Sequence, residues 1–387
     1  MSSATASARE SSWRIASLDQ FRGYTVLGML LVNFVGAFQV VPGVLKHNHS
    51  YCSYADTIMP GFFFAVGFAY RLTFLRRWKT HGAWSAIGHV IRRSLGLILL
   101  GAVVYHLDGR YESWSEMEQL GVWGVLGSSW KRSLFQTLTH IGVTSLWVLP
   151  VIGGPAWLRI LFALASGTIH WLLSFGWSTW SNYVWVHTEP RGIDGGPLGF
   201  LTWTIPLLAG SLACDAMVKL SEPASGTQSV TPTALRFFLW GFVIMVTAYL
   251  LSCLVIKPFR WGDDVGWEWG PLPLVHVPPH PPNNLMTMSQ RAGSVTYLLF
   301  GAGFSLALYG LFVVLSDGRG WQVGIFRTFG SNALAAYLIH DVVDNAIKPF
   351  TPKDSPAWYV AGMFALFLGI CWVFVRYLEK RQIYLRL

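Results

Sequence analysis

The sequence predicts an all-α integral membrane protein with about ten transmembrane helices. Hydrophobic residues make up 53% of the 387 residues and charged residues only 12%. The mean hydropathy is +0.43. Apolar segments of roughly 17 to 25 residues, the length that crosses a bilayer, recur along most of the chain. A chain of this composition has lipid rather than water as its natural surroundings.

The predicted spans follow a polar, Ser-rich tail over residues 1–13, which we expect to be disordered, and they belong to one polytopic domain over residues 14–387. The segments are 21–41, 58–75, 89–107, 133–152, 156–176, 198–217, 234–254, 293–315, 325–347 and 358–379. The first is too long for a signal peptide and has no small-residue cleavage site, so we expect no cleavage. Trp114 to Trp130 mixes acidic and apolar residues, which favours an interfacial amphipathic helix or an eleventh span.

The distribution of Lys and Arg predicts that both termini are cytoplasmic, because positive charges beside the spans are retained on that side. With this orientation most of the 28 Lys and Arg residues face inward. Five loop histidines face outward: His47, His49, His187, His276 and His280. The predicted location is the plasma membrane of a bacterium, with the histidine-bearing loops outside.

The net charge of +9 is explained by this topology. No basic patch is interleaved with base-stacking aromatic residues, so we expect no nucleic-acid partner. The four cysteines lack the spacing of metal ligands, and we expect no metal. Cys52 and Cys253 both lie near the predicted outer face, and whether they pair is left open.

Polar residues in the first quarter of the chain mark a candidate site. Arg22, Asn33, His47 and Asp56 lie in or beside the first two predicted spans, where lipid does not tolerate uncompensated polar groups. His47 could be a general base or a solvated loop residue, with His49 as a competing candidate. Asn33 could stabilise an oxyanion or bond another helix. Asp56 could orient the imidazole or cap the second span.

Two further places carry polar residues that lipid does not explain. In the ninth span Asn332, Ala336, His340 and Asp344 recur every four residues, which puts them on one helix face directed to the protein interior. Asp194 precedes two glycines and a proline, so it begins the sixth span or supplies a carboxylate to a cationic ligand.

Three motifs carry a family resemblance. The opening run contains a pattern close to S-x-D-x-F-R-G, then V-N, K-H and A-D, and then a proline-aromatic-glycine span. It is formed by Ser17, Asp19, Phe21, Arg22, Gly23, Val32, Asn33, Lys46, His47, Ala55, Asp56, Pro60, Phe62, Phe63, Phe64 and Gly67. The second and third motifs are residues 193–210 and 329–341. The chain resembles the heparan-α-glucosaminide N-acetyltransferase family over nearly its whole length, with His140 standing where that family commonly has another basic residue.

The resemblance implies transfer of an acetyl group from cytosolic acetyl-CoA to an amino sugar on the opposite face, by a single all-helical membrane domain. The implied catalytic residues are His47, Asn33 and Asp56. The candidate acetyl-CoA ligands, taken from the basic residues of the predicted inner face, are Arg22, Arg71, Arg76 and Arg77, although Arg22 could instead pair with Asp19. The candidate acceptor ligands are His49, Asp194, His340, Asp344 and Asn332. The expected partners are the bilayer and an amino-sugar or glycan acceptor, with a homodimer also considered.

Two other functions stay open. Membrane sugar O-acetylases share an L-D-x-x-R-G opening but carry a histidine eleven residues after the arginine, where this chain has Asn33. A transporter of a polar solute would also bury histidines and carboxylates, but it predicts related halves with broken helices, and no internal repeat is evident. The natural acceptor, N- or O-acetylation, and direct transfer or an acetyl-histidine are likewise open.

Overall fold

The computed structural model describes residues 15–49, 51–106, 113–129, 134–174, 193–220, 229–256, 267–269 and 285–385. The chain divides into two compact units. The first unit comprises Met1–Val41, Lys219–Leu239 and Ala307–Arg386, and the second comprises Pro42–Val218 and Trp240–Leu306. The division falls within α10 (Thr231–Ser252) and α11 (Val295–Phe312), so each unit contains part of both helices.

Seven helices among the described residues are long and apolar enough to cross a membrane. They are α3 (Tyr54–His81), α4 (Ala83–His106), α7 (Ala156–Leu173), α9 (Phe200–Leu220) with the turn η3 (Gly196–Leu198) before it, α10, α11 and α14 (Ala357–Lys380). They coincide with seven of the ten predicted segments: 58–75, 89–107, 156–176, 198–217, 234–254, 293–315 and 358–379. The helical, multi-pass membrane class is confirmed, whereas ten spans and cytoplasmic termini stay predictions.

The other three predicted segments form shorter or more polar helices. The first forms α2 (Ala16–Val35), which ends six residues before the predicted boundary at position 41. The fourth forms α6 (Thr137–Ile152), whose 16 residues extend about 24 Å. The ninth is two helices, α12 (Gly324–Ser331) and α13 (Ala333–Ile347), because Asn332 leaves the helical conformation with φ −135° and ψ 51°.

In the second unit, α3 and α9 run in the same direction in direct backbone contact. A Cβ on Gly67 would lie 1.8 Å from the carbonyl oxygen of Leu207, and one on Gly210 would lie 1.9 Å from that of Phe64. Small residues permit this approach in membrane proteins. The membrane-length windows of α3 and α9 are 61% and 72% buried, compared with 22% for α4 and α7. The contacting pair therefore forms the centre of this unit.

The helices α4 and α6 are antiparallel neighbours, so the segment that joins them begins and ends on the same side of the unit. Gly142 of α6 packs on Ser94 of α4, Gly101 of α4 packs on Thr139, and the Leu138 N–H donates to the hydroxyl of Tyr105. Since α6 begins beside the end of α4, the chain through α5 (Trp114–Ser129) returns to the level at which it left α4. The helix α5 is also interrupted at Gly121, where φ is 63°. This path gives α5 no need to cross the membrane, and both its interfacial position and the eleventh span stay predictions.

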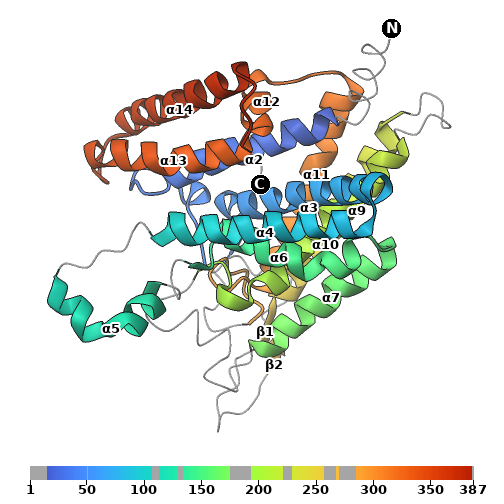
Figure 1. Ribbon diagram of the computed structural model, residues 1–387, viewed down its shortest axis with the longest axis horizontal. Helices are drawn as coiled ribbons and strands as arrows, with labels where there is room; N and C mark the ends of the chain where they lie inside the picture. The colour runs from blue at the N-terminus through green and yellow to red at the C-terminus, as the bar shows by residue number, and fades with distance from the viewer. Residues whose placement is uncertain are drawn as a thin grey trace. The chain divides into compact units, whose positions relative to one another are not determined.

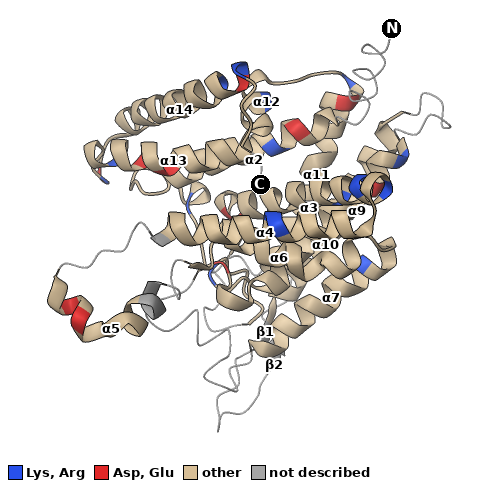
Figure 2. Cartoon of the chain, viewed as in Figure 1, with Lys and Arg blue, Asp and Glu red and all other residues tan. Residues whose placement is uncertain are grey.

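The apolar faces of the peripheral helices are exposed, as expected of lipid-facing surfaces. Leu99 of α4, Leu164 of α7 and Phe242 of α10 are examples. Figure 2 shows that most of the described helical surface carries neither acidic nor basic residues. After α10, β1 (Leu254–Ile256) and β2 (Trp267–Trp269) form a short antiparallel pair.

In the first unit, α2 packs on α12, with α13 beside α14 (Figure 1). The backbones touch, because a Cβ on Gly23 would lie 1.8 Å from the carbonyl oxygen of Phe326 and one on Gly330 would lie 2.1 Å from that of Asp19. A π-helical segment, η5 (Val313–Gly318), follows α11, and its Asp317 accepts a hydrogen bond from the Ser17 N–H at 3.2 Å. These contacts fix the start of α2.

Candidate active site

His47 and Asp56 form the best-defined part of the candidate site, in the second unit. His47 follows the turn η1 (Gly43–Leu45), and its Nδ1 lies 2.8 Å from Asp56 Oδ1. The other oxygen of Asp56 accepts from the N–H of Asn48 at 3.2 Å and from the N–H and hydroxyl of Ser53 at 3.0 and 2.9 Å. The two uses predicted for Asp56 therefore coexist, because Ser53 and Asp56 also form the capping box that begins α3.

This arrangement assigns the tautomer of His47. A carboxylate only accepts, so Nδ1 carries a proton, and in the neutral ring Nε2 keeps its lone pair. The His47 side chain is 40% exposed, whereas Asp56 is 1% exposed. Partial burial lowers the pKa of His47, but the hydrogen bond and charge of Asp56 and the charge of Asp194 outweigh it, so the pKa is raised from its ordinary value. The competing residue His49 lies exposed two positions further along the loop.

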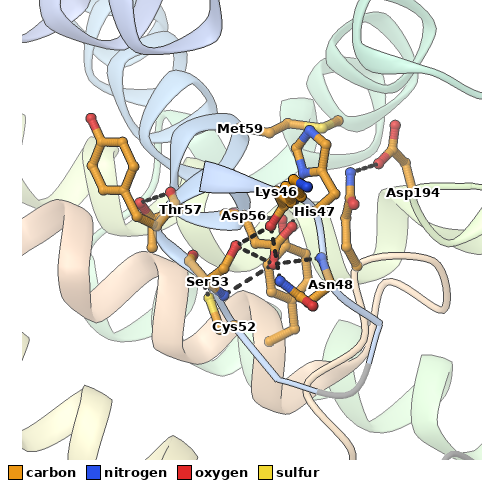
Figure 3. A network of polar contacts seen from close by, with 12 residues as sticks. Lys46, His47, Asn48, Cys52, Ser53, Asp56, Thr57, Met59 and Asp194 are labelled. Atoms are coloured by element: carbon orange, nitrogen blue, oxygen red, sulfur yellow. Dashed lines mark hydrogen bonds and ion pairs between the residues drawn. The ribbon is translucent and has the colours of Figure 1, made fainter. Parts of the chain in front are cut away.

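Asp194 supplies a second buried carboxylate beside this pair (Figure 3). It has a positive φ of 54°, which Asp tolerates better than most residues, and it precedes Gly195 with φ 85°. Its Oδ1 accepts from Gln290 Nε2 at 3.1 Å. Burial raises the pKa of Asp194 to about 6, assisted by the charge of Asp56 and opposed by His47 and Gln290. The structure thus brings His47, Asp56 and Asp194 into one electrostatic cluster.

Two aromatic residues hold the turns that carry these acids. The indole N–H of Trp203 donates to the carbonyl of Asp194 at 2.9 Å, and the hydroxyl of Tyr297 donates to the carbonyl of Asp56 at 2.8 Å. The two rings meet edge to face with centroids 6.0 Å apart. Sequence reasoning missed Trp203, Tyr297 and Gln290. Trp203 lies within the second motif, residues 193–210, which could have singled it out, whereas no local pattern marks Tyr297 or Gln290.

In the first unit, Asn33 lies in the last turn of α2, and its Nδ2 is 3.5 Å from Nε2 of His340. His340 is buried, with Nδ1 bonded to the carbonyl of Tyr337 and Nε2 3.1 Å from Asp341 Oδ1. Since α2 ends at Val35, Asn33 is two residues from the helix end and not deep within a span as the predicted boundary implied. Asn33 thus contacts another helix, the alternative left open for it, and its catalytic role and the ligand role of His340 stay predictions.

The other two members of the ninth-span pattern have different surroundings. Asp344 accepts from Lys348 Nζ at 2.6 Å, and the same ammonium donates to the carbonyl of Asn33 at 3.2 Å. Asn332 is not part of the polar helix face, because it lies at the break before α13 and bonds the C-terminal segment through Ile383 and Leu385. The four-residue periodicity is therefore wrong for Asn332, whose contacts are those of a structural anchor.

Among the arginines expected to meet acetyl-CoA, Arg71 is already engaged. Its guanidinium is buried, bonds Asp215 at 2.9 Å and donates to the carbonyl of Ile152. Arg159, fully buried, bonds the same carboxylate and the hydroxyl of Ser211. Sequence reasoning missed this three-residue cluster because its members lie far apart in the chain. Its net charge is +1.

The remaining arginines are more accessible. Arg76 is exposed and Arg77 half-buried near the end of α3, so both could meet a phosphate. Arg22 lies 3.3 Å from Asp19, which agrees with the ion-pair alternative. Their role as ligands of acetyl-CoA stays a prediction.

The two polar clusters of the second unit lie at different levels along α3, one in its first turn and the other at Arg71. Fifteen residues separate Asp56 from Arg71, which is about 22 Å along a helix. Ile152, Arg159 and Asp215, all predicted on one side of the bilayer, gather at the level of Arg71, while Asp194 and Gln290, predicted on the other, gather at the level of Asp56. In this unit, residues that the predicted spans put on the same side of the bilayer are therefore neighbours in the structure. Which side is cytoplasmic stays a prediction.

The four cysteines, all within the described residues, are free, so Cys52 and Cys253 are not paired. Over the same residues no group of three or more His, Cys, Asp or Glu is arranged to hold a metal ion. His187, His276 and His280 lie outside the described residues. A scan against protein-family models finds no match to this chain, and a search of curated proteins finds no significant relative.

Proposed function

We propose that the chain is a membrane acetyltransferase that moves an acetyl group from acetyl-CoA to the amino group of an amino sugar. The observation that carries the proposal is the His47–Asp56 pair, in which Nδ1 is fixed at 2.8 Å while the ring stays 40% exposed. An imidazole held in this way can accept a proton at Nε2 near neutral pH. The resemblance of the three motifs to those of the N-acetyltransferase family favours acetyl transfer over other proton-transfer chemistry.

The proposed reaction begins after the bound ammonium group of the acceptor has released one proton to solvent, which leaves a neutral amine beside His47. As its nitrogen attacks the thioester carbonyl carbon, the N–H proton moves to Nε2 and a C–N bond forms. The C–S bond then breaks, and the leaving CoA thiolate takes that proton from His47, which gives the N-acetyl sugar and the CoA thiol. Asp56 holds the imidazolium in place. An acetyl-histidine route would divide the same transfer into two steps.

Two further groups have proposed roles. Asp194 offers a carboxylate to the ammonium form of the acceptor, since His47 and Asp194 already interact electrostatically. For Asn33, which belongs to the first unit, the oxyanion role stays a separate prediction that its own variant tests. Acetyl-CoA would meet Arg76 and Arg77 with its phosphates, because Arg71 is occupied by Asp215 and Ile152.

The test uses purified protein, acetyl-CoA labelled in the acetyl group and a panel of amino sugars. We expect labelled N-acetyl product, and label on the protein before acceptor is added only if the acetyl-histidine route operates. The Asn33→Ala variant should lose roughly 10²- to 10³-fold in rate while inserting normally into membranes. An Asn33→Ala protein with full activity would remove this residue from the site, and a wild-type protein that neither binds nor turns over acetyl-CoA would refute the proposal.

The same experiment separates two other functions. Product on a hydroxyl group would identify a sugar O-acetyltransferase. Binding of sugar without turnover of acetyl-CoA would favour a solute transporter, for which the helix break at Asn332 is a specific supporting feature. Labelled flux of the sugar into proteoliposomes is the measurement that would establish transport.

A further inference from the structure

His140, on α6 in the second unit, is a buried histidine that the proposed chemistry does not use. It is 1% exposed, and its Nε2 has no hydrogen-bond partner among the described residues. Its other ring nitrogen is therefore the one that bonds the backbone of Phe135. Because a carbonyl can only accept, Nδ1 carries the proton and Nε2 is left as a buried acceptor. Buried polar atoms without partners are rare and call for a missing donor.

The position of this acceptor is fixed by Gly199. A Cβ at residue 199 would lie 2.7 Å from Cε1 and 3.1 Å from Nε2 of His140, and 2.3 Å from the carbonyl oxygen of Asp194. The imidazole and the Asp194 backbone therefore pack against the same glycine. His140 thus lies next to the turn that presents the Asp194 carboxylate to His47.

A second unpaired group continues this polar surface. Thr144 follows His140 by four residues, so the two side chains share one face of α6. Its hydroxyl is also buried and has no partner within the described part of the chain. Within the described residues neither atom is hydrogen-bonded to a charged side chain, which suits an uncharged ligand.

We propose that His140 Nε2, with the Thr144 hydroxyl beside it, binds a hydroxyl group of the acceptor. This inference rests on the proposed function, because it assigns the amino group and a hydroxyl group of one amino sugar to two neighbouring binding sites. The ammonium group lies at Asp194 and His47, and a neighbouring ring hydroxyl donates to His140. The ligand class is then an amine that carries a hydroxyl, rather than any amine.

The experiment measures the binding of two ring amines, glucosamine and cyclohexylamine, to the purified full-length protein in nanodiscs without acetyl-CoA. Wild type should bind glucosamine more tightly. In His140→Phe, which retains a flat ring without the acceptor, glucosamine affinity should fall about 3- to 10-fold and cyclohexylamine affinity should not change. Thr144→Val, close to the same shape, should show a smaller loss of the same kind.

His140→Gln is the matched control, because its carbonyl oxygen can accept the same hydrogen bond and should recover part of the affinity. Thermal unfolding of each variant establishes that it is folded, and Thr144→Val carries the test if His140→Phe is not. The inference would be overturned if His140→Phe lost the same affinity for both amines or for neither. It would also be overturned if wild type bound glucosamine and cyclohexylamine equally well. If the protein binds glucosamine selectively but transfers no acetyl group, the proposed function is refuted and the binding site at His140 is not.

Discussion

Two turns of the second unit each place a buried aspartate near His47, but the two carboxylates differ in the number of hydrogen bonds that they accept. Asp56 accepts four hydrogen bonds, from His47, Asn48 and two groups of Ser53, which fills the capacity of a carboxylate. The Asp194 carboxylate accepts a hydrogen bond at Oδ1 from the side chain of Gln290. The comparison indicates that Asp56 is built to hold the imidazole, whereas Asp194 retains capacity for a ligand.

The pKa values of Asp194 and His47 also indicate that Asp194 is suited to a cationic ligand. Burial raises the pKa of Asp194 to about 6, so its charge is costly unless a cation shares the site. His47 responds in the opposite sense, since both carboxylates raise its pKa. A cationic amine entering between them would favour the ionised form of Asp194. Binding of the acceptor and ionisation of this turn are therefore coupled.

Replacing Asp56 should have the largest effect on activity. Asp56→Asn removes the negative charge that holds Nδ1–H of His47, and acetyl transfer should fall roughly 10²-fold or more. It also weakens the capping box of α3, at a cost of about 0.5–2 kcal/mol in stability. Steady-state rates and thermal unfolding measure the two effects. Ser53→Ala is the matched control, because it disturbs the cap but leaves the bond to His47. Equal rates in the two variants would contradict the assigned role.

Replacing Asp194 should have an intermediate and pH-dependent effect. Asp194→Asn should raise KM for the acceptor about 10-fold, because the ammonium loses its counter-ion. The raised pKa predicts stability that is present below pH 3.8 and lost as the pH rises through about 6. The variant removes that loss, so it should unfold at a higher temperature than wild type near pH 7 and at a similar one near pH 4. A variant less stable than wild type at both pH values would break the comparison.

Replacing Gln290 should have the smallest effect. Gln290→Ala removes one hydrogen bond from Asp194 Oδ1, worth about 0.5–1.5 kcal/mol. Because that bond lowers the pKa of Asp194, its loss should move the acidic limb of the rate profile to higher pH and leave kcat at alkaline pH nearly unchanged. The pH dependence of kcat/KM provides the measurement, and Gln290→Glu serves as the like-charge control. An unmoved acidic limb would show that Gln290 does not control Asp194.

Local patterns in the sequence predicted most of the long helices and one contact within the candidate site. Hydropathy placed seven spans, and the clustering of polar residues in the opening run selected His47 and Asp56, which lie nine positions apart and meet across one loop. The opening run also selected Asn33, and the four-residue spacing of the ninth span selected His340, which lies beside it, although the predicted first span extended α2 too far. Apolar residues after Val35 continue the hydropathy signal without continuing the helix.

Contacts between distant segments could not be predicted in this way. Arg71, Arg159 and Asp215 come from three helices, and only packing brings two arginines onto one carboxylate. Asn332 has the right spacing for a polar helix face, but the C-terminal segment takes its side chain and ends the periodicity. Trp203 and Tyr297 look like ordinary membrane aromatics until their hydrogen bonds to the two aspartate turns are seen.

The central claim is that His47, held by Asp56, moves the proton of the acceptor amine during acetyl transfer. The most direct measurement compares labelled acetyl transfer by wild type and His47→Ala, each with and without added imidazole, with His49→Ala as the matched loop control. The account predicts that His47→Ala loses roughly 10²- to 10⁴-fold, that imidazole restores part of this loss, and that His49→Ala stays near wild type. A His47→Ala protein as active as wild type would contradict it.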